Sequence, residues 1–207
     1  TFKFGRVVDV VLDESSPYYE EFGQSQAVNG IRYRPLDKAY SQDEDAILPF
    51  AYCGNTHLIN VPLKNEIVII TSLPSEDRQG NSLQTKTYWL SIVNIWNHPH
   101  HNAYPDTLQD GDGKADLGDD FKEVDTVAPL QTYPGDILIS GRHGNTIRLG
   151  GTKHQYNTLT EEADNGKPFI IVKNKMDEPQ DGMALSSEDI NKDGSSIYMV
   201  SDHIVPL

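Results

Sequence analysis

The chain has a single cysteine, Cys53, among its 207 residues. One thiol excludes an intrachain disulfide, so we expect a fold held by packing and hydrogen bonds, as in proteins made in a reducing compartment. Basic residues are also scarce, because 17 Lys and Arg stand against 31 Asp and Glu, for a formal net charge of −14. Nucleic-acid and anionic-membrane binding both depend on clustered cations, and this balance argues against either partner.

Long apolar runs are missing as well. No stretch reaches the roughly 18 apolar residues needed to span a bilayer. The opening residues TFKFGRVVDVV contain no signal-peptide core, so we expect synthesis in the cytoplasm without a leader. Hydrophobic residues make up only 37% of the chain, and no amphipathic helical stripe persists along it. These features favour a thin-cored, loop-rich protein over a compact helical enzyme.

Short β-type runs recur along the chain. Alternating or continuous apolar residues predict strands near residues 4–12, 31–36, 47–50, 58–63, 66–71, 86–96, 137–139, 146–149, 168–173 and 195–200. The only helix expected is one short turn within 18–26. The fold class is therefore predicted to be all-β. Residues 1–96 should form a small antiparallel barrel, 97–127 an acidic, polar loop insertion, and 128–207 a β-rich continuation that completes or extends the barrel.

The segment 134–152, PGDILISGRHGNTIRLGGT, has the pattern of a complete β-hairpin. Two alternating strands flank a polar crossing that contains Arg142, His143 and Asn145, and we treat these three as interface candidates. Glycine tolerates backbone conformations closed to other residues, so the glycines of this segment are predicted to be structural turn residues. They are Gly135, Gly141, Gly144 and Gly150.

Two polar clusters are candidate metal sites. The imidazoles of His98, His100 and His101 stand close together in sequence, although a solvated loop explains them equally. The run Asp189-x-Asn191-x-Asp193-Gly matches the first half of a calcium loop. Its twelfth position is a valine where a bidentate glutamate belongs, so a polar turn feeding a strand is the competing interpretation.

Catalytic signatures do not occur. The sequence contains no G-x-S-x-G elbow and no H-E-x-x-H pair, and its one cysteine shows no Cys-His signature. We therefore predict no catalytic residues, no cofactor and no enzymatic activity. The aromatic residues Tyr88, Trp89 and Trp96 are interface candidates. The two tryptophans fall on opposite faces of one strand, so one of them should belong to the core.

Three segments carry a resemblance to a known group of proteins. The pattern P-G-D-[apolar]-x-[apolar]-x-G-R-x-G-N-x-I-R-[apolar]-G over 134–150 resembles a segment of baseplate and central-spike structural proteins of contractile-tailed bacteriophages. The run EDINKDGSSIYM at 188–199 is similar to an ending found in the same group. Residues 5–8 and 62–68 are compatible with the oligonucleotide/oligosaccharide-binding (OB) barrel that such spike proteins carry.

The resemblance implies an OB-like barrel with long loop insertions and additional C-terminal strands. It also implies a structural virion protein at the central spike or hub of the tail baseplate, forming a homo-oligomer, expected as a trimer, with other baseplate proteins as partners. No lysozyme helix or octapeptide repeat accompanies these segments. The alternative is a metal- or glycan-binding β module, such as an accessory to cell-wall hydrolysis, because the OB fold does not itself define a function.

Overall fold

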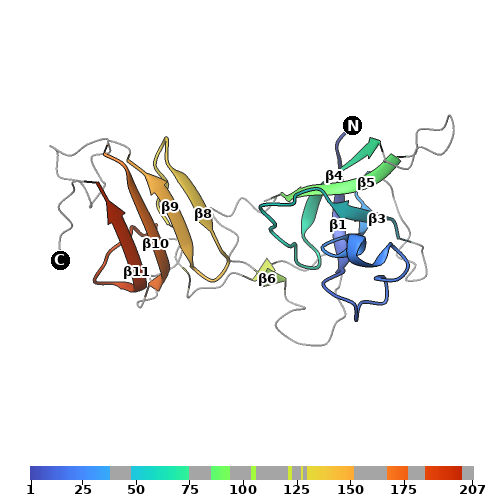
Figure 1. The fold of residues 1–207 in the computed structure, drawn as a ribbon, viewed down its shortest axis with the longest axis horizontal. Coiled ribbons are helices and arrows are strands. Elements are labelled where there is room, and N and C mark those ends of the chain that lie inside the picture. Colours follow the sequence, from blue (N-terminus) through green and yellow to red (C-terminus); the bar gives the residue numbers. More distant parts are fainter. Residues whose placement is uncertain are drawn as a thin grey trace. The chain divides into compact units, whose positions relative to one another are not determined.

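This computed structural model describes residues 1–37, 48–74, 85–93, 104–105, 121–122, 127, 130–151, 167–176 and 185–201. The chain divides into two compact units, Thr1–Asn97 with Pro105–Asp120, and His98–Tyr104 with Phe121–Leu207. The described residues are nearly all β, which confirms the predicted fold class. The first unit contains a closed barrel and the second a four-stranded sheet (Figure 1).

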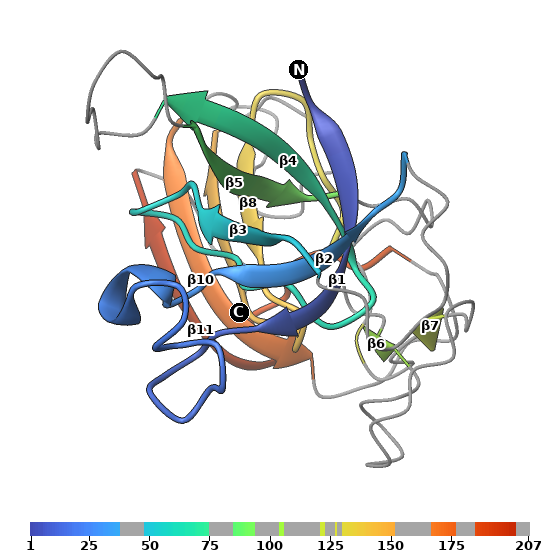
Figure 2. The same ribbon diagram turned by 90° about the vertical axis from the view of Figure 1, so that its right-hand side faces the viewer.

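The barrel has five strands: β1 (Lys3–Val10), β2 (Ile31–Pro35), β3 (Phe50–Cys53), β4 (Ile67–Pro74) and β5 (Thr85–Ile92). Their order around the barrel is β1-β2-β3-β5-β4, and β4 returns to pair with β1 (Figure 2). All pairs are antiparallel except β3 with β5. This five-stranded Greek-key barrel has the architecture of the OB fold, which agrees with the expectation from the sequence.

Alternation along each strand fills the barrel. Ile31 and Tyr33 of β2 are buried in the barrel, whereas Arg32 and Arg34 alternate with them on the outer side and are half-buried. The largest core side chain is Trp89, whose indole donates a hydrogen bond to the carbonyl of Asn29 at 2.8 Å. The rest of the barrel core consists of Tyr33 and five smaller apolar residues, which are Val7, Ile31, Ala51, Val68 and Ile70.

The excursion between β1 and β2 contains the one described helix, a 3₁₀ turn η1 (Gln24–Ala27). It returns to the barrel at Gly30, where the backbone has no room for a side chain. A Cβ atom there would lie 2.7 Å from the carbonyl oxygen of Ala27 and would overlap the ring of Phe50. Position 30 therefore requires glycine, because any side chain there would clash with Ala27 and Phe50 just before β2 begins.

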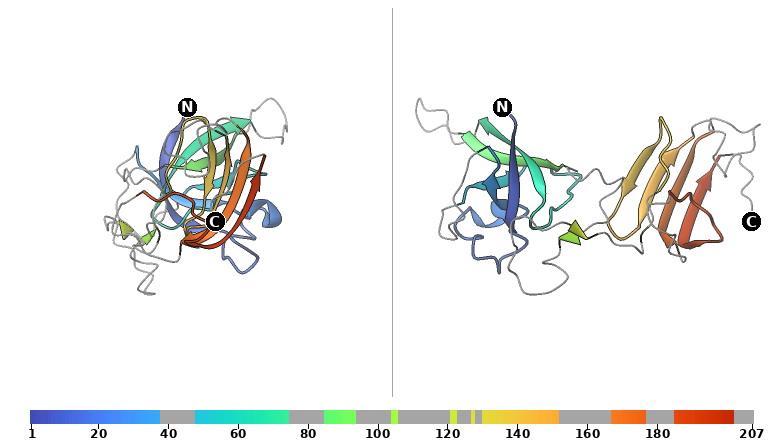
Figure 3. Two further views of the ribbon diagram at one scale, coloured as in Figure 1. Left: turned by 90° about the vertical axis from the view of Figure 1, so that its left-hand side faces the viewer. Right: turned by 180° about the vertical axis from the view of Figure 1, so that it is seen from behind.

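The second unit holds a sheet with the order β11-β10-β9-β8, formed by β8 (Ile137–Ser140), β9 (Thr146–Gly150), β10 (Phe169–Met176) and β11 (Asp193–Val200). All its pairs are antiparallel, and Figure 3 shows the same order from behind. A separate two-stranded sheet joins β6 (Tyr104–Pro105) and β7 (Phe121–Lys122).

Three sequence expectations differ from these elements. The strand predicted over 47–50 overlaps β3 at Phe50 alone. The residues expected to complete or extend the barrel form a sheet of their own, because five strands ending at Ile92 already close the barrel. Residues 58–63 are described but are not a strand. Pro62 cannot donate a ladder hydrogen bond, and the chain instead turns at Asn65, which has a positive φ of 71°.

Candidate functional site

One face of the four-stranded sheet is largely aliphatic. Register pairs Ile137 with Leu149, Leu149 with Ile170, and Ile170 with Met199, which gives a row across all four strands. A second row, two residues along, is formed in the same way by Ile139, Ile147, Val172 and Ile197. Partners in antiparallel register point to the same side of a sheet. We call these two rows of four residues the aliphatic face.

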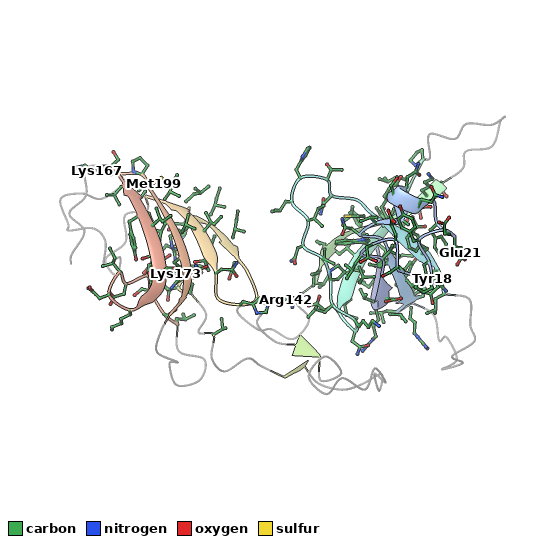
Figure 4. The ribbon with its side chains drawn as sticks, turned by 60° about the horizontal axis from the view of Figure 1, so that its bottom comes forward. Tyr18, Glu21, Arg142, Lys167, Lys173 and Met199 are labelled. Atoms are coloured by element: carbon green, nitrogen blue, oxygen red, sulfur yellow. The ribbon has the colours of Figure 1, made fainter. Side chains whose placement is uncertain are left out.

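The aliphatic face is open in this chain. Its residues on the edge strand β11, Ile197 and Met199, are 62% and 51% exposed, and Ile137 on the opposite edge is 58% exposed. Figure 4 shows Met199 on β11. Even Ile147 and Leu149 on the inner strand β9 are 39% and 41% exposed. Large aliphatic side chains clustered in this way form a contiguous apolar patch, which is uncommon on the surface of a monomer, whereas single exposed apolar residues are ordinary.

A polar row borders the aliphatic face at one end. Asn174 and Ser195 are paired in register, and the Asn174 amide donates a hydrogen bond to the Ser195 hydroxyl at 2.8 Å. Both residues are exposed. An apolar centre with a polar margin is the usual composition of a protein–protein contact.

The opposite face of the sheet is covered and contains a buried arginine. The Arg148 guanidinium binds Glu188 Oε1 at 2.5 Å and Asp136 Oδ2 at 3.2 Å, and it donates to the carbonyl of Gln131 at 2.5 Å. Its Cζ atom lies 5.2 Å from the ring centroid of Tyr133, and burial raises the pKa of that phenol. Arg148 thus ties the segments before β8 and before β11 to the middle of the sheet.

The calcium-like run serves a structural role on the same covered face. Asp193 Oδ1 lies 3.2 Å from the Lys173 ammonium, and its Oδ2 accepts a hydrogen bond from the Tyr198 hydroxyl at 3.0 Å. Asp189 accepts a hydrogen bond from the backbone NH of Asn191 at 3.0 Å, as in an Asx turn. Both carboxylate oxygens of Asp193 are therefore engaged, and one of them faces a cation.

Metal-ligating side chains do not converge in the part of the chain that the structure describes, where no group of three or more His, Cys, Asp or Glu is placed to hold an ion. His98, His100 and His101 lie outside the described residues, as does Trp96. The expectations for these four residues stay predictions.

Gly141 and Gly144 lie in the turn between β8 and β9 and Gly135 lies in the turn before β8, whereas Gly150, also predicted to be a turn residue, is the last residue of β9 and pairs with Phe169. Gly141 donates a backbone hydrogen bond to the carbonyl of Asn145 at 2.8 Å, and Gly144 has a φ of 84°. Gly135 has a φ of 94° in the turn closed by the Asp136 NH and the Tyr133 carbonyl.

The polar interface candidates cluster at that turn. Arg142 lies at the tip of the hairpin (Figure 4) and is half-buried, while His143 and Asn145 are exposed. Gly150 ends β9, where a Cβ would meet the Phe169 ring at 2.5 Å. The hairpin tip lies next to the Ile139–Ile147 pair, which is one end of the aliphatic face, and the two strands of the hairpin carry four of the eight residues of that face.

The outer face of β2, β3 and β5 presents a second surface, an aromatic cluster. Phe22 stacks on Phe50 at 4.1 Å, Phe50 meets Tyr52 edge-on at 5.0 Å, and Tyr88 lies 6.1 Å from Tyr52. Cations flank these rings, with Arg32 4.5 Å above Tyr18 and Lys86 5.3 Å above Tyr52. Figure 4 marks Tyr18 on the excursion between β1 and β2. Outer faces of this kind are where OB folds bind their ligands.

Of the aromatic interface candidates that the structure describes, one is partly exposed and one is buried. Tyr88 is partly exposed in the aromatic cluster. Trp89 is 1% exposed inside the barrel, so it is the core tryptophan and offers no surface to a partner.

The aliphatic face has a sequence signal that cannot be recognised from one strand at a time. Each of the four strands contains two aliphatic residues spaced by two, and only their shared register shows that they form one surface.

Comparison with known proteins adds no relative. No family model, curated protein or solved structure matches the chain. Among the described residues, none of the helical structure is long and apolar enough to cross a membrane.

Proposed function

We propose that this chain is a non-enzymatic structural protein of a bacteriophage tail baseplate, located at the central spike or hub. It is made in the host cytoplasm and incorporated into the virion as a homotrimer. Other baseplate proteins are its remaining partners. It acts through contacts, without a cofactor.

The segments that carry the resemblance support this proposal through their positions in the fold. The run 134–150 forms the hairpin of β8 and β9, and the run 188–199 forms most of β11. These segments, distant in sequence, belong to one sheet and are joined across it by the contact between Arg148 and Glu188. Both of these resembling segments therefore belong to the same four-stranded sheet.

The aliphatic face is the observation that carries the proposal. Two rows of four aliphatic side chains span a whole sheet, and no charge interrupts them. Such a surface is suited to a permanent contact, because obligate interfaces resemble a protein core cut in half. Sites for small-molecule substrates are instead concave and place a few polar groups among apolar ones.

Immunogold electron microscopy tests the proposal. Antibodies raised against the purified chain are applied to virions of the phage that encodes it, and to tails released from those virions. We expect label at the centre of the baseplate and peptides of the chain in mass spectra of purified tails. Virions that contain no such peptides would overturn the proposal.

A second candidate function, glycan binding, is favoured by the aromatic cluster. Partly exposed rings flanked by Arg32 and Lys86 offer stacking surfaces and hydrogen-bond donors to a sugar chain. Titration calorimetry with muropeptide oligosaccharides tests it, using Tyr88→Ala as the variant. Binding that the variant abolishes supports this function. Absence of heat at millimolar sugar sets it aside.

A further inference from the structure

We infer that the aliphatic face is where copies of this chain associate, each copy covering the face of its neighbours. This inference rests on the proposed structural function and names the partner of that surface. Its occupant is the same sheet in another copy of the chain. The apolar rows then form a shared core between sheets, with the polar row of Asn174 and Ser195 at its margin.

The chemistry of the face favours a permanent partner. All eight of its side chains are aliphatic: Ile137, Ile139, Ile147, Leu149, Ile170, Val172, Ile197 and Met199. A partner that recognises charge finds nothing to pair with here, and a transient partner would leave the face open to water for part of the time. A copy of the same chain is present from synthesis onward and carries a surface of the same composition.

The shape of the face suits self-association. Two rows of aliphatic side chains on a twisted sheet pack against an equivalent sheet at about 10 Å, as the inner faces of β-sandwiches do. The exposed fractions of its six most open residues leave on the order of 500 Å² of apolar surface, near the upper limit for a monomer. Two such surfaces together bury on the order of 1,000 Å², the scale at which a specific interface begins.

The net charge explains why the contact is confined to this face. Copies with a formal net charge of −14 repel one another over most of their surfaces. A contact made by uncharged side chains brings no like charges together at short range. Salt screens the repulsion between the remaining, negatively charged surfaces. The association should therefore tighten as the salt concentration rises, opposite to a contact made by ion pairs.

The experiment measures the mass of the full chain by size-exclusion chromatography with light scattering, over a concentration series at low and high salt. The test variant is Ile139→Lys on the aliphatic face. The matched control is Ile59→Lys in the barrel unit, because the two isoleucines are 44% and 43% exposed. Each lysine reduces the net negative charge, so a loss of association in Ile139→Lys cannot be caused by added overall repulsion.

We expect an oligomer for the wild type and for Ile59→Lys. For Ile139→Lys we expect a dissociation constant raised by about tenfold or more. A milder double variant, Ile139→Thr with Ile147→Thr, guards against misfolding, since threonine keeps β propensity at these paired positions. Circular dichroism establishes that the variants are folded.

The outcomes separate this inference from the proposed function. A monomeric wild type overturns the inference, as does an oligomer that persists in folded forms of both face variants. In either case, label at the baseplate centre would still support the structural role. A wild-type dimer lost in the face variants supports the inference and overturns the trimer. If the wild type associates through this face but the immunogold experiment shows no label at the baseplate, the proposed function alone is overturned.

Discussion

The ammonium of Lys173 and the carboxylate of Asp193 form an ion pair at 3.2 Å, and their side chains are only 3% and 0% exposed. The Tyr198 hydroxyl donates to the second oxygen of the same carboxylate. Lys173 lies within β10 and Asp193 is the first residue of the adjacent strand β11, so the ion pair joins the two strands where β11 begins. Neither charge reaches water, so each depends on the other for its stability.

Removing one partner of this pair should strongly destabilise the second unit. Lys173→Met leaves Asp193 buried without its cation, and we expect a loss of about 3–5 kcal/mol in unfolding free energy. Hydrogen exchange with mass spectrometry, read on peptides of β10 and β11, measures the loss. Lys192→Met is the control, because that lysine is 54% exposed beside Asp189 and should cost less than about 1 kcal/mol. Equal effects of the two variants would contradict the prediction.

Tyr198 should make stability fall at alkaline pH. Burial raises the pKa of Tyr198, and the Asp193 carboxylate adds to the shift. Unfolded tyrosine releases its proton near pH 10, whereas folded Tyr198 retains it, so the native state binds more protons and unfolding free energy falls as pH rises further. Burial raises the pKa of Tyr133 in the same direction.

Chemical unfolding at pH 9, 10 and 11 measures this dependence. We expect full stability at the lowest value and a progressive fall above it. Tyr198→Phe should give a shallower fall, and adding Tyr133→Phe should flatten it further. A steeper fall in these variants than in the wild type would contradict the assignment.

Arg148 should not be replaceable by lysine. Its planar fork reaches Glu188, Asp136 and the Gln131 carbonyl at once, and a single ammonium cannot satisfy all three. We expect Arg148→Lys to cost about 3–5 kcal/mol, because a buried carboxylate loses its partner. Urea unfolding followed by circular dichroism measures it. Lys192→Arg, at a side chain that is 54% exposed, should change stability by about 0.5 kcal/mol or less, and a comparable loss there would argue against the special role of Arg148.

The strands were more predictable from sequence than the side-chain partners. Apolar alternation located β1, β2, β4, β5 and the hairpin, because it depends on residues near one another in the chain. The contact of Arg148 with Glu188 joins residues 40 apart, and no local pattern encodes it. The calcium-like run shows the same limit. Its aspartates fit a local motif, but β10 places Lys173 beside one of them.

Calcium should leave the melting temperature unchanged. Asp193 already faces an ammonium and a phenol hydroxyl, and Asp189 is held by the Asn191 backbone and lies 3.7 Å from the Lys192 ammonium. A divalent cation would have to displace positive charge to bind these oxygens. Differential scanning fluorimetry in millimolar calcium and in chelator tests this. A rise in melting temperature that Asp189→Asn removes would restore the calcium hypothesis.

Phe22 should control how tightly the excursion between β1 and β2 is held to the barrel. Its ring stacks on Phe50, and its carbonyl accepts a hydrogen bond from the Tyr52 hydroxyl at 3.1 Å. Phe22→Ala removes part of the about 1.5–3 kcal/mol that full burial of a phenylalanine is worth, because this ring is half-buried. Local opening and Glu-C cleavage at the exposed Glu21 should therefore become faster, by up to about tenfold. Phe2→Ala, at a ring already 69% exposed, should leave the rate unchanged. Equal rates for Phe22→Ala and the wild type would show that the backbone alone anchors this segment.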